Sequence, residues 1–232
     1  MNVFLTPPGK HFDGGLGMSA SNFKSASESL RNSENNQSGA LPICYLQRHS
    51  IELYLKSLIY ILHKKFDVPF GEGFNLEKPA ILSNGKWKPL SNTHNLSDLF
   101  NYFLSIFDSE KVSVPSTTDW TIDPKVKGKI DLISGYDPNS TYFRYPKALD
   151  AKRDAIKSDI KPMDLESAIE QMNSPDGAPV KCTVILDAND NIVETYDLFA
   201  ESLLDVKKAL DETIEFMHCI HSAFLGELTK WS

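Results

Sequence analysis

The segment LPICYLQRHSIELYLKSLIYILHKK, residues 41–65, is the longest helical signal in the chain. It contains no Gly or Pro after Pro42, and Pro42 suits a first helical turn because its missing N–H would have had no partner there. Apolar side chains recur at helical spacing, at Cys44, Leu46, Ile51, Leu53, Leu55, Leu58 and Leu62. We therefore predict one long helix around which the rest of the fold is organised.

A polar stripe runs along this predicted helix. At about 100° per residue its members share one narrow sector, with apolar residues on both sides; they are Tyr45, Arg48, His49, Glu52 and Lys56. One interpretation is a solvent-exposed face with an Arg48–Glu52 pair that contributes about 0.2–0.5 kcal/mol. The other is a polar seam that faces a partner helix or a ligand. Periodicity alone favours the solvent-exposed face.

Composition sets limits on the class of protein. The chain has 232 residues, 41% of them hydrophobic and 24% charged, which is typical of a soluble globular protein with a well-formed core. Its net charge of -7 argues against broad non-specific binding to nucleic acid. No apolar run reaches the roughly 18 residues of a membrane span, and the start lacks the pattern of a secretory signal. We expect a cytoplasmic protein without a membrane partner.

Metal and cofactor motifs are not evident in the sequence. Cys44, Cys182 and Cys219 are widely spaced and form no C-x-x-C pair, which indicates reduced, buried thiols. His218 and His221 could share a metal ion by spacing, but no further ligand motif accompanies them, so we interpret them as packing or interface residues. We also find no Gly-rich loop that would cradle a phosphate. The expectation is no metal and no cofactor.

The flanking segments indicate a helical domain with two β-hairpins. Residues 1–18 are rich in Gly and Pro and predict an extended arm, and residues 19–232 predict a single domain. Asn84-Gly85 is a strong hairpin signal, near residues 78–90, and β-branched runs around DANDN predict a second hairpin near 179–196. Together, and with residues 141–145, these could form one small antiparallel sheet.

Further helices follow from apolar periodicity and capping residues. Ser91 or Asn92 is the expected N-cap of a helix that contains HNLSDLFNYFLSIFD. The other predicted helices span residues 19–32, 121–134, 165–172 and 199–224.

Three segments in order carry a family resemblance: LQRHSIELYLK at 46–56, THNLSDL at 93–99 and FRYP at 143–146. The order resembles the HEPN family of helical bundles, in which a helix reading H-x-x-E-x-x-L-K precedes an H-x-L helix start and a later Arg-Tyr element. The resemblance covers about residues 40–148. It implies an antiparallel bundle of four or five helices, here mainly α with a small antiparallel β insertion (α+β), and often a homodimer.

The resemblance also implies functional classes. HEPN domains commonly belong to prokaryotic toxin–antitoxin or phage-defence systems, some as metal-independent ribonucleases and others as non-catalytic binding or scaffold units. The ribonucleases carry Arg and His in an R-x4-6-H motif. None of the four arginines, Arg31, Arg48, Arg144 and Arg153, has a His at that spacing, and Arg48 directly precedes His49.

Candidate site residues come from the three segments. Cleavage of RNA without a metal needs a base, an acid and a cation, for which the candidate catalytic residues are His49, His94 and Arg144. The candidate binding set adds their neighbours and reads Arg48, His49, Glu52, Lys56, His94, Arg144 and Tyr145. In an equally supported interpretation, Glu52 and Lys56 form a buried network with Arg144 and Tyr145 that specifies the fold.

These observations favour a non-catalytic HEPN-like binding or scaffold protein of a prokaryotic defence or toxin–antitoxin system. A homodimer or another protein is the expected partner, with RNA or a nucleotide as the other candidate ligands. One alternative is a ribonuclease toxin that uses His49, His94 and Arg144. The second is a nucleotide-binding regulatory module in which Arg48, Lys56 and Arg144 hold phosphates.

Overall fold

The chain divides into two compact units in a computed structural model: Met1–Tyr145 with Asp205–Ser232, and Pro146–Leu204. Both hairpins were expected within a single domain over 19–232, whereas the structure places one hairpin in each unit. The structure describes residues 7–33, 40–115, 117–145, 147, 151–158, 161–173, 182–197 and 203–230. The fold is mainly helical with small antiparallel sheets.

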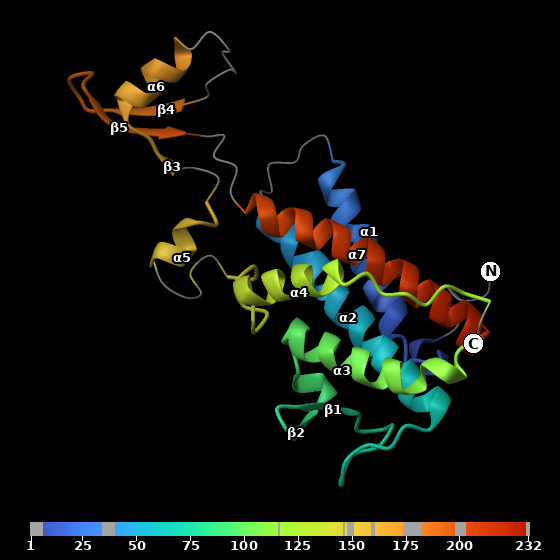
Figure 1. The fold of residues 1–232 in the computed structure, drawn as a ribbon. Coiled ribbons are helices and arrows are strands. Elements are labelled where there is room, and N and C mark those ends of the chain that lie inside the picture. Colours follow the sequence, from blue (N-terminus) through green and yellow to red (C-terminus); the bar gives the residue numbers. More distant parts are fainter. Residues whose placement is uncertain are drawn as a thin grey trace. The chain divides into compact units, whose positions relative to one another are not determined.

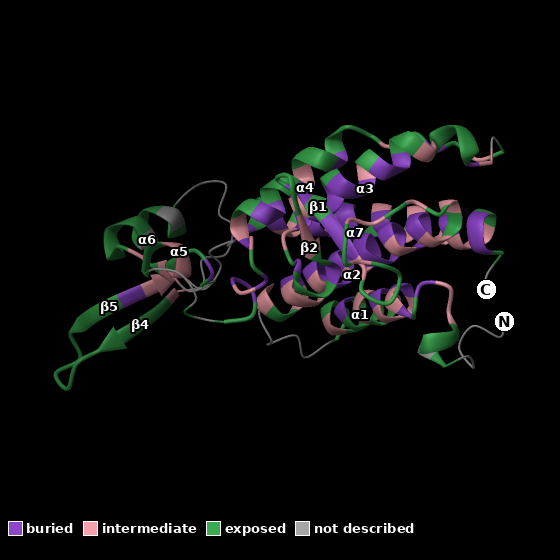
Figure 2. Cartoon of the chain, turned by 90° about the horizontal axis from the view of Figure 1, so that it is seen from below, coloured by how far each residue is buried: buried purple, intermediate pink, exposed green. Residues whose placement is uncertain are grey.

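The first unit is built from long helices packed around α2 (Figure 1). Its helices are α1 (Leu16–Arg31), α2 (Ala40–Phe66), α3 (Leu96–Glu110), α4 (Lys125–Tyr136) and α7 (Leu204–Phe224), the last followed by a π-helical turn at Leu225–Thr229. Fully buried side chains of α2 form the centre of the core, including Ile51, Tyr54, Leu55, Leu58, Ile59, Ile61 and Leu62. Figure 2 shows buried residues on α2, α3 and α7.

Helix boundaries follow the local chemistry of the chain. The prediction of a long helix over 41–65 is confirmed by α2. The expected N-cap of α3 was wrong: residues 90–92 form a 3-10 turn, and Asn95 is the cap, its side chain accepting the N–H of Asp98 at 3.0 Å. The helix expected from residue 121 starts at Lys125, whose N–H is accepted by Asp123 Oδ1 at 2.9 Å. Among the described residues, no helix combines the length and apolarity needed to cross a bilayer.

The described part of the expected N-terminal arm is folded, not extended. Pro8–Lys10 is a 3-10 helix, and Asp13 is buried, at 4% exposure, just before α1. Asp13 accepts the N–H groups of Gly15 and Gly17 at 2.9 and 2.7 Å, so it caps the first turn of α1. Residues 1–6 of the predicted arm lie outside the described residues.

Asp13 also ties the start of α1 to two other helices. Its Oδ2 accepts a hydrogen bond from Ser57 Oγ on α2 and lies 3.7 Å from His221 Nε2 on α7. Ser57 Oγ and His221 Nε2 are 2.9 Å apart. Burial would raise the pKa of Asp13, but the hydrogen bonds from His221, Ser57 and the backbone outweigh it and hold that pKa far below its ordinary value.

The first hairpin, β1 (Ala80–Ser83) and β2 (Lys86–Pro89), confirms the prediction at Asn84-Gly85. Both turn residues have positive φ, 53° and 72°, as the Asn-Gly signal requires. The hairpin belongs to the helical unit, where Ala80 and Ile81 are fully buried and β1 contacts α3.

The second unit holds α5 (Ala151–Ala155), β3 (Lys161–Pro162), α6 (Leu165–Met172), β4 (Cys182–Leu186) and β5 (Ile192–Asp197). Its strands form an antiparallel sheet in the order β3-β5-β4. The expected single sheet is therefore wrong, because the two hairpins belong to separate sheets. Residues 141–145 are not a strand either: they form a helical turn in which Tyr145 N–H donates to Thr141 O at 3.1 Å.

Of the three cysteines, only Cys44 is buried. Cys182 is half-buried and Cys219 is exposed, which differs from the buried state expected for all three.

We predict that Gly17→Ala destabilises the protein. An alanine Cβ would lie 2.1 Å from His221 Nε2 and 2.9 Å from Asp13 Oδ2, so the buried cluster would have to move. The expected loss is about 1–3 kcal/mol in the free energy of unfolding, measured by chemical denaturation. Gly128→Ala is the matched control, because its Cβ meets nothing within 4 Å in α4 and should stabilise by roughly 0.5–1 kcal/mol. A Gly17→Ala variant as stable as wild type would contradict this packing.

Candidate functional site

The charged part of the polar stripe on α2 is buried. Arg48 is 0% exposed, Glu52 2% and Lys56 6%. The interpretation of a solvent-exposed face is therefore wrong for these three residues, and the interpretation of an internal polar seam is confirmed. The seam faces the start of α3 and the turn that follows α4, as the contacts of Arg48 show.

Arg48 joins three segments of the chain through its guanidinium. Nη1 donates to Glu52 Oε2 at 2.7 Å, one helical turn along α2. Nη2 donates to the backbone carbonyl oxygen of His94, just before α3, and to that of Asp137, just after α4, at 3.3 Å. Nε lies 3.0 Å from Asp137 Oδ2 as an ion pair, without the alignment of a hydrogen bond.

Glu52 is the carboxylate shared by this network. Its Oε1 accepts from Lys56 Nζ at 2.8 Å and lies 2.9 Å from His94 Nδ1, while Oε2 binds Arg48. Burial by itself would raise the pKa of Glu52, but Lys56 and Arg48 outweigh it and lower that pKa below its ordinary value. Glu52 is therefore an anion in the folded protein at neutral pH.

Asp137 completes the network and was not identified from the sequence. Its Oδ1 accepts the backbone N–H groups of Thr141 and Tyr142 at 2.7 and 2.9 Å, which holds the turn that carries the Arg-Tyr element. The signal for this role was its place ahead of Pro138 and Asn139, where Asp commonly binds backbone groups further along a turn. Two cations and two carboxylates thus balance in a buried site, which we call the Arg48 network: Arg48, Lys56, Glu52 and Asp137.

Arg144 and Tyr145 lie outside the Arg48 network. The predicted pairing of Arg144 with Glu52 is wrong: Arg144 is exposed, and its guanidinium carbon lies 5.4 Å from the ring centroid of Tyr45. Tyr145 is 49% exposed. A buried network around Glu52 is present and includes Lys56, as expected. Its other members are Arg48, His94 and Asp137, and not Arg144 and Tyr145.

His49 belongs to an aromatic cluster beside Arg144. Its ring is stacked on Tyr45 at 5.9 Å and meets Phe23 edge-on at 4.5 Å. Burial lowers the pKa of His49, and the positive charge of Arg48 adds to this while Glu52 opposes it. A neutral ring sandwiched between aromatic side chains fits packing better than proton transfer. We name the accessible part of this region the Arg144 surface, comprising Tyr45, His49, Arg144 and Tyr145.

His94 is the candidate whose geometry suits proton transfer. Its side chain is 45% exposed, while Nδ1 contacts the buried Glu52 carboxylate. A carboxylate on Nδ1 fixes the ring and its tautomer and leaves Nε2 available to act as a base or acid. Nε2 has no protein partner in the part of the chain that the structure describes. Among the described residues, no hydrogen bond joins His94 to Arg144.

A second polar cluster has catalytic residue types but lacks access. Asp13, Ser57 and His221 meet in the core, yet Ser57 is 0% exposed and the same nitrogen of His221 faces both partners. A catalytic serine must reach a substrate, and the histidine must use separate nitrogens for Ser and Asp. His218 likewise bonds internally, with Nδ1 2.9 Å from Tyr54 Oη. Within the described ranges, no group of three or more His, Cys, Asp or Glu residues is placed to hold a metal ion.

We predict that the two arginines of the motif segments differ sharply in their effect on stability. Arg48→Met leaves the buried carboxylates of Glu52 and Asp137 without their cation, and should cost about 3–5 kcal/mol of unfolding free energy. Arg144→Met is the matched control: it removes an exposed cation–π contact and should cost about 1 kcal/mol or less. Chemical denaturation of both variants tests this, and equal losses would contradict the assignment of Arg48 to the core.

The stability contributed by Glu52 should depend on pH. Because the pKa of Glu52 is lowered in the folded state, its contribution is complete above the ordinary value of 4.5 and is lost as pH falls through the folded value. The difference in unfolding free energy between wild type and Glu52→Gln should therefore be largest near neutral pH and shrink below pH 4.5. A difference that stays constant down to strongly acidic pH would show that Glu52 is not held as a buried anion.

Comparison with known proteins gives no relative from which to transfer a site. No protein-family model, no curated protein and no solved structure matches this chain. The resemblance to the HEPN family therefore rests on the three motif segments alone.

Proposed function

We propose that this chain is a non-catalytic, HEPN-like binding or scaffold protein that acts in the cytoplasm within a prokaryotic phage-defence or toxin–antitoxin system. The observation that carries the proposal is the complete burial of Arg48, whose guanidinium is bound to Glu52, to Asp137 and to the carbonyl of His94. An arginine held in this way has no group left for a phosphate, so the motif serves the fold.

The burial of Lys56 argues against the nucleotide-binding alternative. Of the three cations considered for phosphate binding, Arg48 and Lys56 are buried and paired with Glu52, and only Arg144 is exposed. One exposed arginine is a poor match for a polyphosphate, which normally meets several cations or a helix N-terminus.

The Arg144 surface is where we place the partner contact. It combines an exposed arginine and tyrosine with a stacked Tyr45–His49 pair. Tyrosine and arginine are, with tryptophan, the side chains enriched among residues that dominate binding energy in protein interfaces. We propose that a second copy of the chain binds here and forms a homodimer.

A ribonuclease is the second candidate because of one observation at His94. Its Nδ1 lies 2.9 Å from Glu52 Oε1, while the side chain is half-exposed. Such a histidine could activate the 2′-hydroxyl of RNA, and Arg144 could stabilise the phosphorane. His49, with its ring packed between Tyr45 and Phe23, fits the catalytic role less well than His94.

We predict that the purified protein leaves a labelled RNA pool intact in the presence of EDTA. Wild type, His94→Gln and Arg144→Ala should behave alike, because in this proposal Arg48 and Glu52 serve the fold and Arg144 serves a protein contact. Gel analysis of the RNA checks this. Cleavage by wild type that disappears in both variants would establish the ribonuclease alternative, provided that both variants unfold with wild-type free energies.

The partner proposal is tested by mass in solution. Light scattering coupled to size exclusion should give a dimer for wild type and a monomer for Arg144→Ala combined with Tyr145→Ala. Lys86→Ala, at an exposed hairpin residue outside the Arg144 surface, should remain dimeric. A wild-type monomer, or a dimer indifferent to both sets of changes, would contradict the assignment of the contact to this surface.

A further inference from the structure

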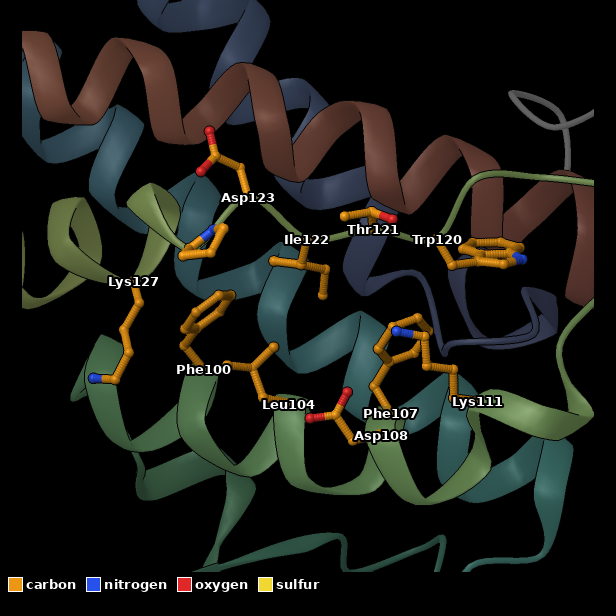
Figure 3. A pocket seen from close by; sticks show the side chains of 11 residues that line it. Phe100, Leu104, Phe107, Asp108, Lys111, Trp120, Thr121, Ile122, Asp123 and Lys127 are labelled. Atoms are coloured by element: carbon orange, nitrogen blue, oxygen red, sulfur yellow. The ribbon is translucent and has the colours of Figure 1, made fainter.

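A cavity of about 340 Å³ opens between α3 and the segment 120–124 that leads into α4 (Figure 3). Apolar side chains line it from both sides: Phe100, Leu104 and Phe107 from α3, and Trp120 and Ile122 from the facing segment. This volume lies at the lower end of the roughly 300–1,000 Å³ that small-molecule sites occupy. The cavity shares no residue with the Arg48 network or the Arg144 surface.

The floor of the cavity is held in place by the core. Phe107 and Trp120 meet edge to face at 6.3 Å, and both contact Phe224 of α7 at 5.8 and 5.4 Å. Trp120 Nε1 donates to the carbonyl oxygen of Pro115 at 2.7 Å, which fixes the orientation of the indole. The apolar surface is therefore formed in advance, so a ligand would not have to order it.

Four charged residues stand at the rim, and two of them already have partners. Asp123 Oδ1 accepts the N–H of Lys125 at the start of α4, and Lys127 Nζ lies 2.7 Å from Asp131 Oδ2.

The other two rim residues are Asp108 and Lys111. Both are exposed, and within the described ranges neither forms a salt bridge or a side-chain hydrogen bond, although the charge of Lys111 also acts on the nearby carboxylate of Asp119. Asp108 lies in the last turn of α3, and Lys111 begins the 3-10 turn Lys111–Ser113 that follows directly, three residues further on. Residues three apart on a helical turn lie on one face of it. Figure 3 shows both on the α3 side of the cavity, beside Phe107.

We propose that this cavity binds a free amino acid with a large apolar side chain, in its zwitterionic form. The ligand's ammonium group pairs with Asp108 and its carboxylate with Lys111, while the apolar side chain lies on Leu104 and Ile122, above the buried Phe107. A ligand that carries only a carboxylate would face Asp108 without compensation, and one that carries only an ammonium would face Lys111. A zwitterion with an apolar body matches both charges and the floor together.

Titration calorimetry with three related probes tests the charge pattern. L-phenylalanine carries both charges, 3-phenylpropanoate lacks the ammonium and phenethylamine lacks the carboxylate. We expect L-phenylalanine to bind at least about tenfold more tightly than either truncated probe, because each loses one charge-assisted hydrogen bond. Failure of L-phenylalanine to bind at millimolar concentration, or equal binding of all three probes, would overturn the proposal.

Two variants assign the charges to residues. Asp108→Asn should remove the advantage of L-phenylalanine over 3-phenylpropanoate, and Lys111→Met should remove its advantage over phenethylamine. Glu72→Gln and Lys86→Met make the same charge changes at exposed positions outside the cavity and should leave all three affinities unchanged. Thermal unfolding verifies that each variant is folded. Preferences that survive in both cavity variants would overturn the proposed pairing.

Discussion

The buried guanidinium of Arg48 is the contact on which the arrangement of the helical unit depends. It fixes the start of α3 through the His94 carbonyl and the end of α4 through Asp137, while Glu52 anchors it to α2. Removing charges from water is costly, so a neutral set of two cations and two carboxylates contributes little net stability compared with apolar packing. The network instead fixes relative positions: its hydrogen bonds and ion pairs require one placement of α2, the start of α3 and the end of α4. Apolar contacts would allow these segments to shift along one another.

The packing of α2 explains why apolar periodicity wrongly favoured a solvent-exposed position for the polar stripe. A surface helix has apolar residues on one side, but α2 packs against both α1 and α3 and buries residues over most of its circumference. When a helix is apolar nearly all round, its few charged positions lie in the interior as well. The wide scatter of apolar residues in 41–65 was the signal that Arg48, Glu52 and Lys56 had to find partners within the fold.

Local chemistry could be predicted from the sequence, and long-range pairing could not. Asn84-Gly85 specified a hairpin because both residues must adopt positive φ, and the apolar periodicity of α2 specified a helix. The cap of α3 was missed because Ser91, Asn92 and Asn95 are all suitable caps, and only the observed backbone shows which one bonds to an N–H. The sequence offered two arginine partners for Glu52, Arg48 at i,i+4 and Arg144, and both fit by residue type. The structure shows the Arg48–Glu52 pair, but buried and not on a solvent-exposed face.

The position of His94 shows how fold and chemistry are coupled in this site. Its backbone carbonyl is part of the contact with Arg48, and its ring contacts Glu52, so the Arg48 network orients the more exposed of the two imidazoles in the motif segments. A change at Arg48 or Glu52 therefore disturbs the fold and His94 together, and a loss of function in such a variant would not identify a catalytic residue. A change at the exposed Arg144 leaves the network in place, whereas any substitution of His94 also removes the contact of its Nδ1 with Glu52. Asp108 and Lys111, at the cavity beside α3, are likewise exposed. Function in this chain is therefore best tested at its exposed polar groups, because the buried ones are already engaged in holding the helices together.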